Sequence, residues 1–104
     1  MKVKIPRKVK IGAYDYTIKF EPNLVYDYKL LGQSLSDRQM IKIEPKTTKQ
    51  TNAVTLWHEI IHSINNVYNC ELNESDTDRI AQGIAAILQS DFGIEFDWSN
   101  IKEN

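Results

Sequence analysis

The two histidines of the chain, His58 and His62, stand four residues apart, and Glu59 directly follows the first of them. On an α-helix, residues four apart lie on one face about one turn from each other, so both imidazoles could bind one metal ion. A glutamate beside the first histidine could then serve as general base toward a metal-activated water. The alternative is an amphipathic helix whose histidines are ordinary polar surface residues. With only two histidines in 104 residues, this spacing rarely arises by chance, and we favour a metal site.

The residues around the motif predict a helix with separate apolar and polar faces. At about 100° per residue, one stripe contains Ala53, Trp57, Ile60, Ile64, Val67 and Tyr68. Both histidines fall outside this stripe, as expected for a helix that lines a cleft. Thr51 or Asn52 is the expected N-cap, and Asn69 ends the apolar pattern.

A catalytic zinc site usually has three protein ligands and an open fourth position. Since both histidines are used and Cys70 is the only thiol, the third ligand is expected to be a carboxylate. The acids that follow are Glu71, Glu74, Asp76 and Asp78. Asp76 is the first choice, because it lies in line with apolar residues of the next helix, where an unpaired carboxylate would be costly. Glu74, at the boundary of that face, is the alternative.

Residues 74–90 predict this second helix. Its expected apolar stripe contains Ile80, Ile84, Ile87 and Leu88, with Ala81 and Ala85 at one edge. Gly83 lies on the same side as Asp76. Because glycine inside a helix costs about 1 kcal/mol relative to alanine, we expect it to permit close approach of the two helices. Asp76 also has a structural interpretation, as the acid of a capping box that begins at Asn73.

The N-terminal half predicts strands. Apolar residues alternate with polar ones over residues 3–11 and 14–20, with a turn at Gly12. Residues 31–43 indicate a second hairpin around residues 36–38. The order of strands followed by two helices predicts an α+β fold, in which a small, mainly antiparallel sheet of two hairpins packs on two helices.

Other segments are less informative. Residues 23–31 are ambiguous, and residues 94–98 are expected to form a short terminal strand. The length suits one domain over residues 1–104. No signal peptide and no membrane-spanning stretch is predicted, and a single cysteine suits a reducing cytoplasm.

Charge is divided unevenly along the chain. Residues 1–49 carry eleven basic and five acidic residues (+6), whereas residues 50–104 carry two basic and nine acidic residues (−7). The acidic half holds the expected metal site, which suits a cation. The basic half could contact nucleic acid, but lysines that protect a sheet edge are the commoner explanation.

Two runs, residues 55–64 and 76–81, resemble compact zincin metallopeptidases, above all small phage-type proteins related to the ImmA/IrrE and SprT-like groups. The resemblance implies a minimal zincin-like domain in which His58 and His62 bind zinc and Glu59 is catalytic. It also implies a third ligand on the next helix, a few residues before an aliphatic residue and an alanine. Matching that pair to residues 80–81 puts the ligand at Asp76, one methylene shorter than the usual glutamate, and leaves Glu74 as the alternative.

The expected function is zinc-dependent hydrolysis of peptide bonds in a protein or peptide substrate, with Glu59 as general base. We expect the substrate to add as a strand along residues 39–43, and the protein to act in the cytoplasm of a bacterial host if it is phage-encoded. One alternative is a catalytically silent zinc-binding scaffold or regulatory protein of phage development. A nucleic-acid accessory protein is disfavoured, because the three arginines are scattered.

Overall fold

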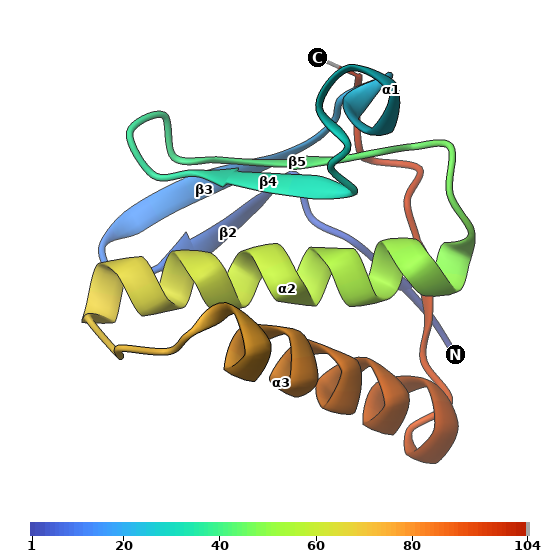
Figure 1. Cartoon of the computed structure of the whole chain (residues 1–104). Helices are drawn as coiled ribbons and strands as arrows, with labels where there is room; N and C mark the ends of the chain where they lie inside the picture. The colour runs from blue at the N-terminus through green and yellow to red at the C-terminus, as the bar shows by residue number, and fades with distance from the viewer. Residues whose placement is uncertain (104) are drawn as a thin grey trace.

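The structure is a computed structural model that describes residues 1–103. Its elements (Figure 1), in chain order, are β1 (Lys2–Lys4), β2 (Lys8–Ile11), β3 (Tyr14–Phe20), α1 (Leu24–Tyr28), β4 (Gly32–Leu35), β5 (Met40–Ile43), α2 (Lys49–Tyr68), α3 (Glu74–Ala86), a π-helical segment η1 (Ile87–Asp91) and β6 (Glu95–Asp97). The expected α+β fold is confirmed.

Four strands form a mixed sheet in the order β2-β3-β5-β4. Both expected hairpins are present, because β2 pairs antiparallel with β3 and β4 pairs antiparallel with β5. The first hairpin turns at Gly12, which has a φ of 61°, a conformation that glycine adopts without strain. A parallel pairing of β3 with β5 joins the two hairpins. The terminal strand β6 also forms, and it pairs parallel with β1 outside this sheet.

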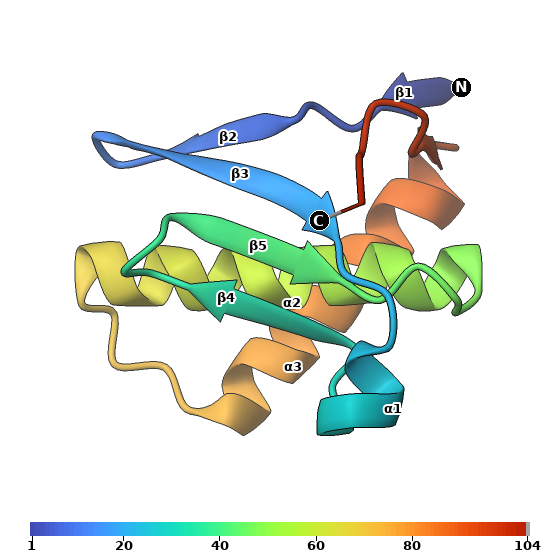
Figure 2. The same cartoon turned by 90° about the horizontal axis from the view of Figure 1, so that it is seen from above.

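The strand order overturns one expectation about the sheet edge. β5 lies between β3 and β4, so the prediction that residues 39–43 form a free edge is wrong. The edge on this side is β4 (Figure 2). Pairing of β5 with β3 joins segments about twenty residues apart in sequence, which turn and alternation patterns do not reveal.

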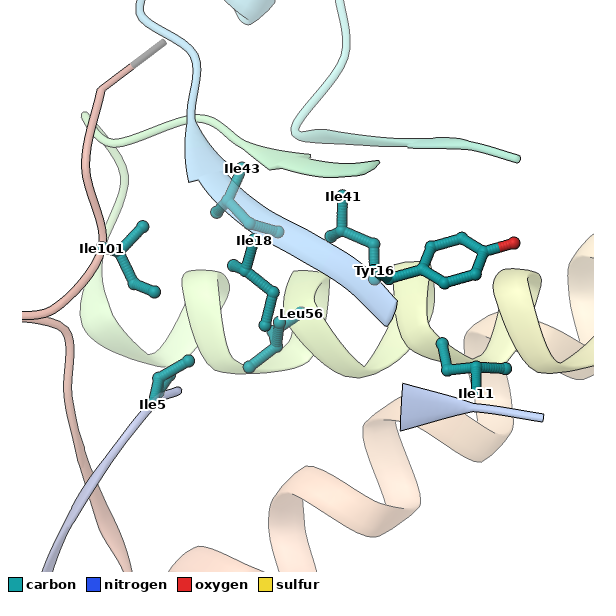
Figure 3. Close-up of a cluster of buried hydrophobic side chains, with 8 residues drawn as sticks. All are labelled: Ile5, Ile11, Tyr16, Ile18, Ile41, Ile43, Leu56 and Ile101. Carbon is teal, nitrogen blue, oxygen red and sulfur yellow. The ribbon is translucent and has the colours of Figure 1, made fainter. Parts of the chain in front are cut away.

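The core lies between the sheet and α2 (Figure 3). Its buried members are Ile5, Ile11, Tyr16, Ile18, Ile41, Ile43, Leu56 and Ile101. Leu56 comes from α2, and Ile101 closes one end of the core from the C-terminal segment. α2 is thereby held against the inner face of the sheet, and its orientation is fixed by this packing.

α3 packs against α2 on the side away from the sheet, so the molecule has three layers (Figure 1). The buried residues of α3 are Thr77, Ala81 and Ala85. The predicted apolar stripe is therefore only partly correct. Ala81 and Ala85, expected at its edge, are buried and Ile84 and Leu88 are half-buried, but Ile80 and Ile87 are exposed. The expectation for Gly83 is wrong, since no atom lies within 4 Å of where its Cβ would be. Small residues four apart let the two helices approach closely, whereas the isoleucines would hold them apart.

Of the two predicted ends of α2, the C-terminal one is confirmed and the N-terminal one is wrong. The helix begins at Lys49, with the Thr48 side chain accepting a hydrogen bond from the Thr51 amide, so the N-cap lies before both expected residues. It ends as expected at Asn69, which has a φ of 54°. Within the described residues, no helix is both long enough and apolar enough to span a membrane.

Candidate metal centre

α2 presents His58 and His62 on its cleft side, as the spacing predicts. Their Nε2 atoms are 3.0 Å apart, and their ring centroids are 4.6 Å apart. Both side chains are partly buried. Because the apolar side of α2 is held against the sheet, the imidazoles face a polar space beside α3.

α3 contributes Glu74 to the same point. Its Oε1 lies 2.8 Å from Nε2 of His58, and its Oε2 lies 3.0 Å from Nε2 of His62. A tetrahedral zinc ion with bonds of about 2.0–2.1 Å sets its donors roughly 3.3 Å apart. The observed separations are close to this value, and two imidazoles with one carboxylate are a donor set that zinc accepts. These three residues therefore fit a zinc ion.

Asp76 lies outside this group. It is two residues beyond Glu74, about 200° further around the helix, and so faces away from the histidines. Its backbone N–H donates a 2.7 Å hydrogen bond to Oδ1 of Asn73, which is the N-cap of α3. Of the four acids considered from the sequence, the structure brings Glu74, the alternative to Asp76, to Nε2 of both His58 and His62.

Glu59 is buried beneath the edge strand. A Cβ built on Gly32 of β4 would lie 3.1 Å from Oε2 of Glu59 and 2.6 Å from Cγ2 of Thr55. Burial, together with the negative charge of Glu74, raises the pKa of Glu59 from 4.5 to about 7. A carboxyl group with such a pKa can both accept and donate a proton near neutral pH.

Asp78 lies behind the first histidine. Its Oδ1 is 3.6 Å from Nδ1 of His58, the ring nitrogen that does not face Glu74. Its Oδ2 accepts a 3.0 Å hydrogen bond from the side-chain amide of Gln82. The sequence identified Asp78 only as one of four acids that could supply the third ligand. A usable signal was present, because Glu74, Asp78 and Gln82 are four apart and must share one face of a helix.

These residues line a cleft of about 910 Å³. One wall is β4 with the segment that precedes it, the floor is α2, and the other wall is α3. The cleft extends past His58, His62 and Glu74 toward the N-terminal end of α2, where Gln50 and Thr51 line it. The cleft therefore has room for a bound molecule in addition to a metal ion.

No protein-family model, no curated protein sequence and no solved structure matches this chain. The resemblance to zincin metallopeptidases rests on the residues of the chain itself, namely the His58, Glu59 and His62 motif and the helix that follows.

Proposed function

We propose that this chain is a zinc-dependent peptidase of the zincin type, which hydrolyses peptide bonds in a protein or peptide substrate. The observation that carries the proposal is the meeting of His58, His62 and Glu74 beside the buried carboxyl group of Glu59. A phage or prophage origin, with action in the bacterial cytoplasm, is part of the same proposal through the family resemblance.

His58, His62 and Glu74 would hold the zinc ion. When bound, zinc lowers the pKa of a coordinated water and polarises the carbonyl group of the scissile bond. Glu74 replaces Asp76 as the proposed third ligand, because only Glu74 reaches both imidazoles.

Glu59 would act as the general base and then as the general acid. Its carboxylate accepts a proton from the attacking water, and the resulting carboxylic acid delivers that proton to the leaving amine. Burial under Gly32 leaves Glu59 only 7% exposed, which would limit its contact with bulk water. The proton is thus retained within the site between the two steps.

Asp78 would position His58. Its Oδ1 lies 3.6 Å from Nδ1 of His58, slightly longer than a hydrogen bond. A small approach would let it accept from Nδ1–H and leave the lone pair of Nε2 free for the metal, as carboxylates behind metal-binding histidines do. The amide of Gln82 holds Asp78 from its other oxygen. The resulting chain from Gln82 through Asp78 to His58 would fix the tautomer and the direction of the imidazole.

The substrate would lie along β4. Among the described strands β4 pairs only with β5, so its other edge offers unpaired backbone groups beside the cleft. Gly32, Gln33 and Ser34 line the cleft at this edge. An extended peptide could add here as a further strand, with its backbone close to His58, His62 and Glu74.

The test combines metal content with hydrolysis. We expect one zinc ion per purified wild-type chain and none in His58→Ala, and we expect zinc-loaded protein to cleave an unfolded protein substrate. Glu59→Gln should keep the metal and lose about a hundredfold to ten-thousandfold in turnover, in line with loss of a general base. Equal turnover by wild type and Glu59→Gln would refute the peptidase function, and a chain that binds zinc without any turnover would be the silent scaffold.

A further inference from the structure

The segment that leads into β4 exposes an unusual number of large apolar side chains. Residues 25–31, which we call the apolar overhang, include Tyr26 (87% exposed), Tyr28 (69%), Leu31 (46%), Val25 (44%) and Leu30 (36%). α1 buries only its first residue, Leu24. Five exposed large apolar side chains within seven residues, interrupted by Asp27 and Lys29, exceed the single scattered apolar residues of ordinary surface and indicate an interaction site.

The apolar overhang is held in place by the core. Leu24 is fully buried, and the buried carboxylate of Glu44 accepts a 3.0 Å hydrogen bond from the Val25 amide. The Glu44 amide in turn donates to the carbonyl of Leu31 at 2.8 Å. The exposed side chains are therefore presented on a fixed segment, which lies beside the start of β4 (Figure 2).

This surface is continuous with the metal cleft, because Leu30 and Leu31 line both. The cleft lining opposite them is uncharged and consists of Gln50, Thr51, Val54, Ala86 and Gln89. Among the described lining residues, Lys29 is the one ionisable side chain at this end. The other ionisable groups, His58, Glu59, His62, Glu74 and Asp78, gather at the metal end. The cleft thus changes along its length from a charged end to a mainly uncharged one, where apolar side chains lie among Gln and Thr.

We propose that the apolar overhang and the adjoining cleft bind large apolar side chains of the substrate while its backbone runs along β4. This assignment rests on the proposed peptidase function and names its substrate class: proteins or peptides with an extended, uncharged segment rich in Leu, Phe or Tyr. The free edge of β4 favours a peptide over a lipid surface, because its N–H and C=O groups pair with another backbone.

The test uses two synthetic peptides of equal length and net charge. One contains Leu, Phe and Tyr, and in the other these residues are replaced by Ser and Gln. Binding is measured with zinc-loaded Glu59→Gln protein, so that cleavage does not interfere. We expect the apolar peptide to bind at least about tenfold more tightly, and Leu31→Gln to remove most of this preference.

Ile87→Gln is the matched control. Ile87 is 49% exposed, close to the 46% of Leu31, but does not line the cleft. It should leave the preference unchanged, which separates loss of a contact from general destabilisation. If both peptides bind equally, or if Ile87→Gln and Leu31→Gln act alike, the inference is wrong.

Cleavage by the zinc-loaded wild type separates this inference from the peptidase proposal. Equal kcat/KM for the two peptides would overturn the apolar specificity and leave the peptidase standing. Preferential binding of the apolar peptide without cleavage of any substrate would refute the peptidase proposal and support the apolar overhang as a peptide-binding surface. A wild-type dimer that Leu31→Gln dissociates, or binding to phosphatidylcholine vesicles in place of the peptides, would assign the surface to another occupant and overturn the inference.

Discussion

Gly32 lies directly over Glu59, so that a Cβ at Gly32 would stand 3.1 Å from the carboxylate oxygen Oε2 and 3.1 Å from Cγ. The same Cβ would lie 2.6 Å from Cγ2 of Thr55, closer than van der Waals contact allows. Glycine is therefore required for β4 to cover this part of α2. A change in the position of β4 would therefore change the burial of the Glu59 carboxyl group.

Gly32→Ala should accordingly displace β4 or Glu59. We expect a loss of about 1–3 kcal/mol in the free energy of unfolding, as for other overpacked sites, and a fall in turnover of the zinc-loaded protein. Urea unfolding and hydrolysis assays measure the two effects. Gly83→Ala is the control, because nothing lies within 4 Å of that position in mid-helix, and it should stabilise the protein by about 0.5–1 kcal/mol. A harmless Gly32→Ala would show that the close contact is not required.

The third ligand can be identified by comparing two acids on α3. Glu74→Ala should lose the zinc ion, because it removes the oxygens that lie 2.8 and 3.0 Å from the two imidazoles. Asp76→Ala should retain it. Metal content of the purified proteins, measured by mass spectrometry, decides between them, and zinc lost only from Asp76→Ala would restore the first choice made from the sequence.

Asp78→Ala should lower zinc affinity by roughly 10–100-fold, the usual effect of removing a carboxylate that orients a metal-binding histidine. Asp78→Asn keeps an acceptor oxygen and should lose less. Competition with a chelator measures the affinity, and ¹⁵N shifts of the His58 ring report its tautomer. Since Asp78 is exposed, unfolding of the metal-free protein should hardly change. An unaltered tautomer and affinity would exclude the positioning role.

Glu59 should make the metal-free protein less stable as pH rises. The pKa of Glu59 is about 7 in the folded protein and 4.5 for a glutamate in the unfolded chain, so the folded state binds the proton more tightly than the unfolded state does. The associated stability is fully present below about pH 4.5 and is lost as pH rises through about 7. This loss amounts to as much as about 3 kcal/mol at 1.36 kcal/mol per pKa unit.

Glu59→Gln removes this titration and should flatten the pH dependence. Urea unfolding of metal-free wild type and variant across this range is the measurement. If the two proteins lose stability in parallel, the pH dependence belongs to another group.

Local features of the structure could be read from the sequence. The spacing of His58, Glu59 and His62 places both imidazoles on one side of a helix wherever that helix packs, because the periodicity of an α-helix is a property of the backbone. The turns at Gly12 and at residues 36–38 likewise predicted two hairpins, since each pairs segments that are adjacent in the chain.

Tertiary structure decided what depends on the placement of one element against another. The parallel pairing of β3 with β5 made β4 the edge beside the cleft, and no turn signal encodes that choice. Periodicity predicted a face centred on the isoleucines of α3 with Ala81 and Ala85 at its edge, but close packing on α2 buried the two alanines and Thr77 most deeply. That rotation of α3 turns Glu74 and Asp78 toward His58. Local spacing thus determined which residues could bind a metal, and helix packing decided which acid meets them.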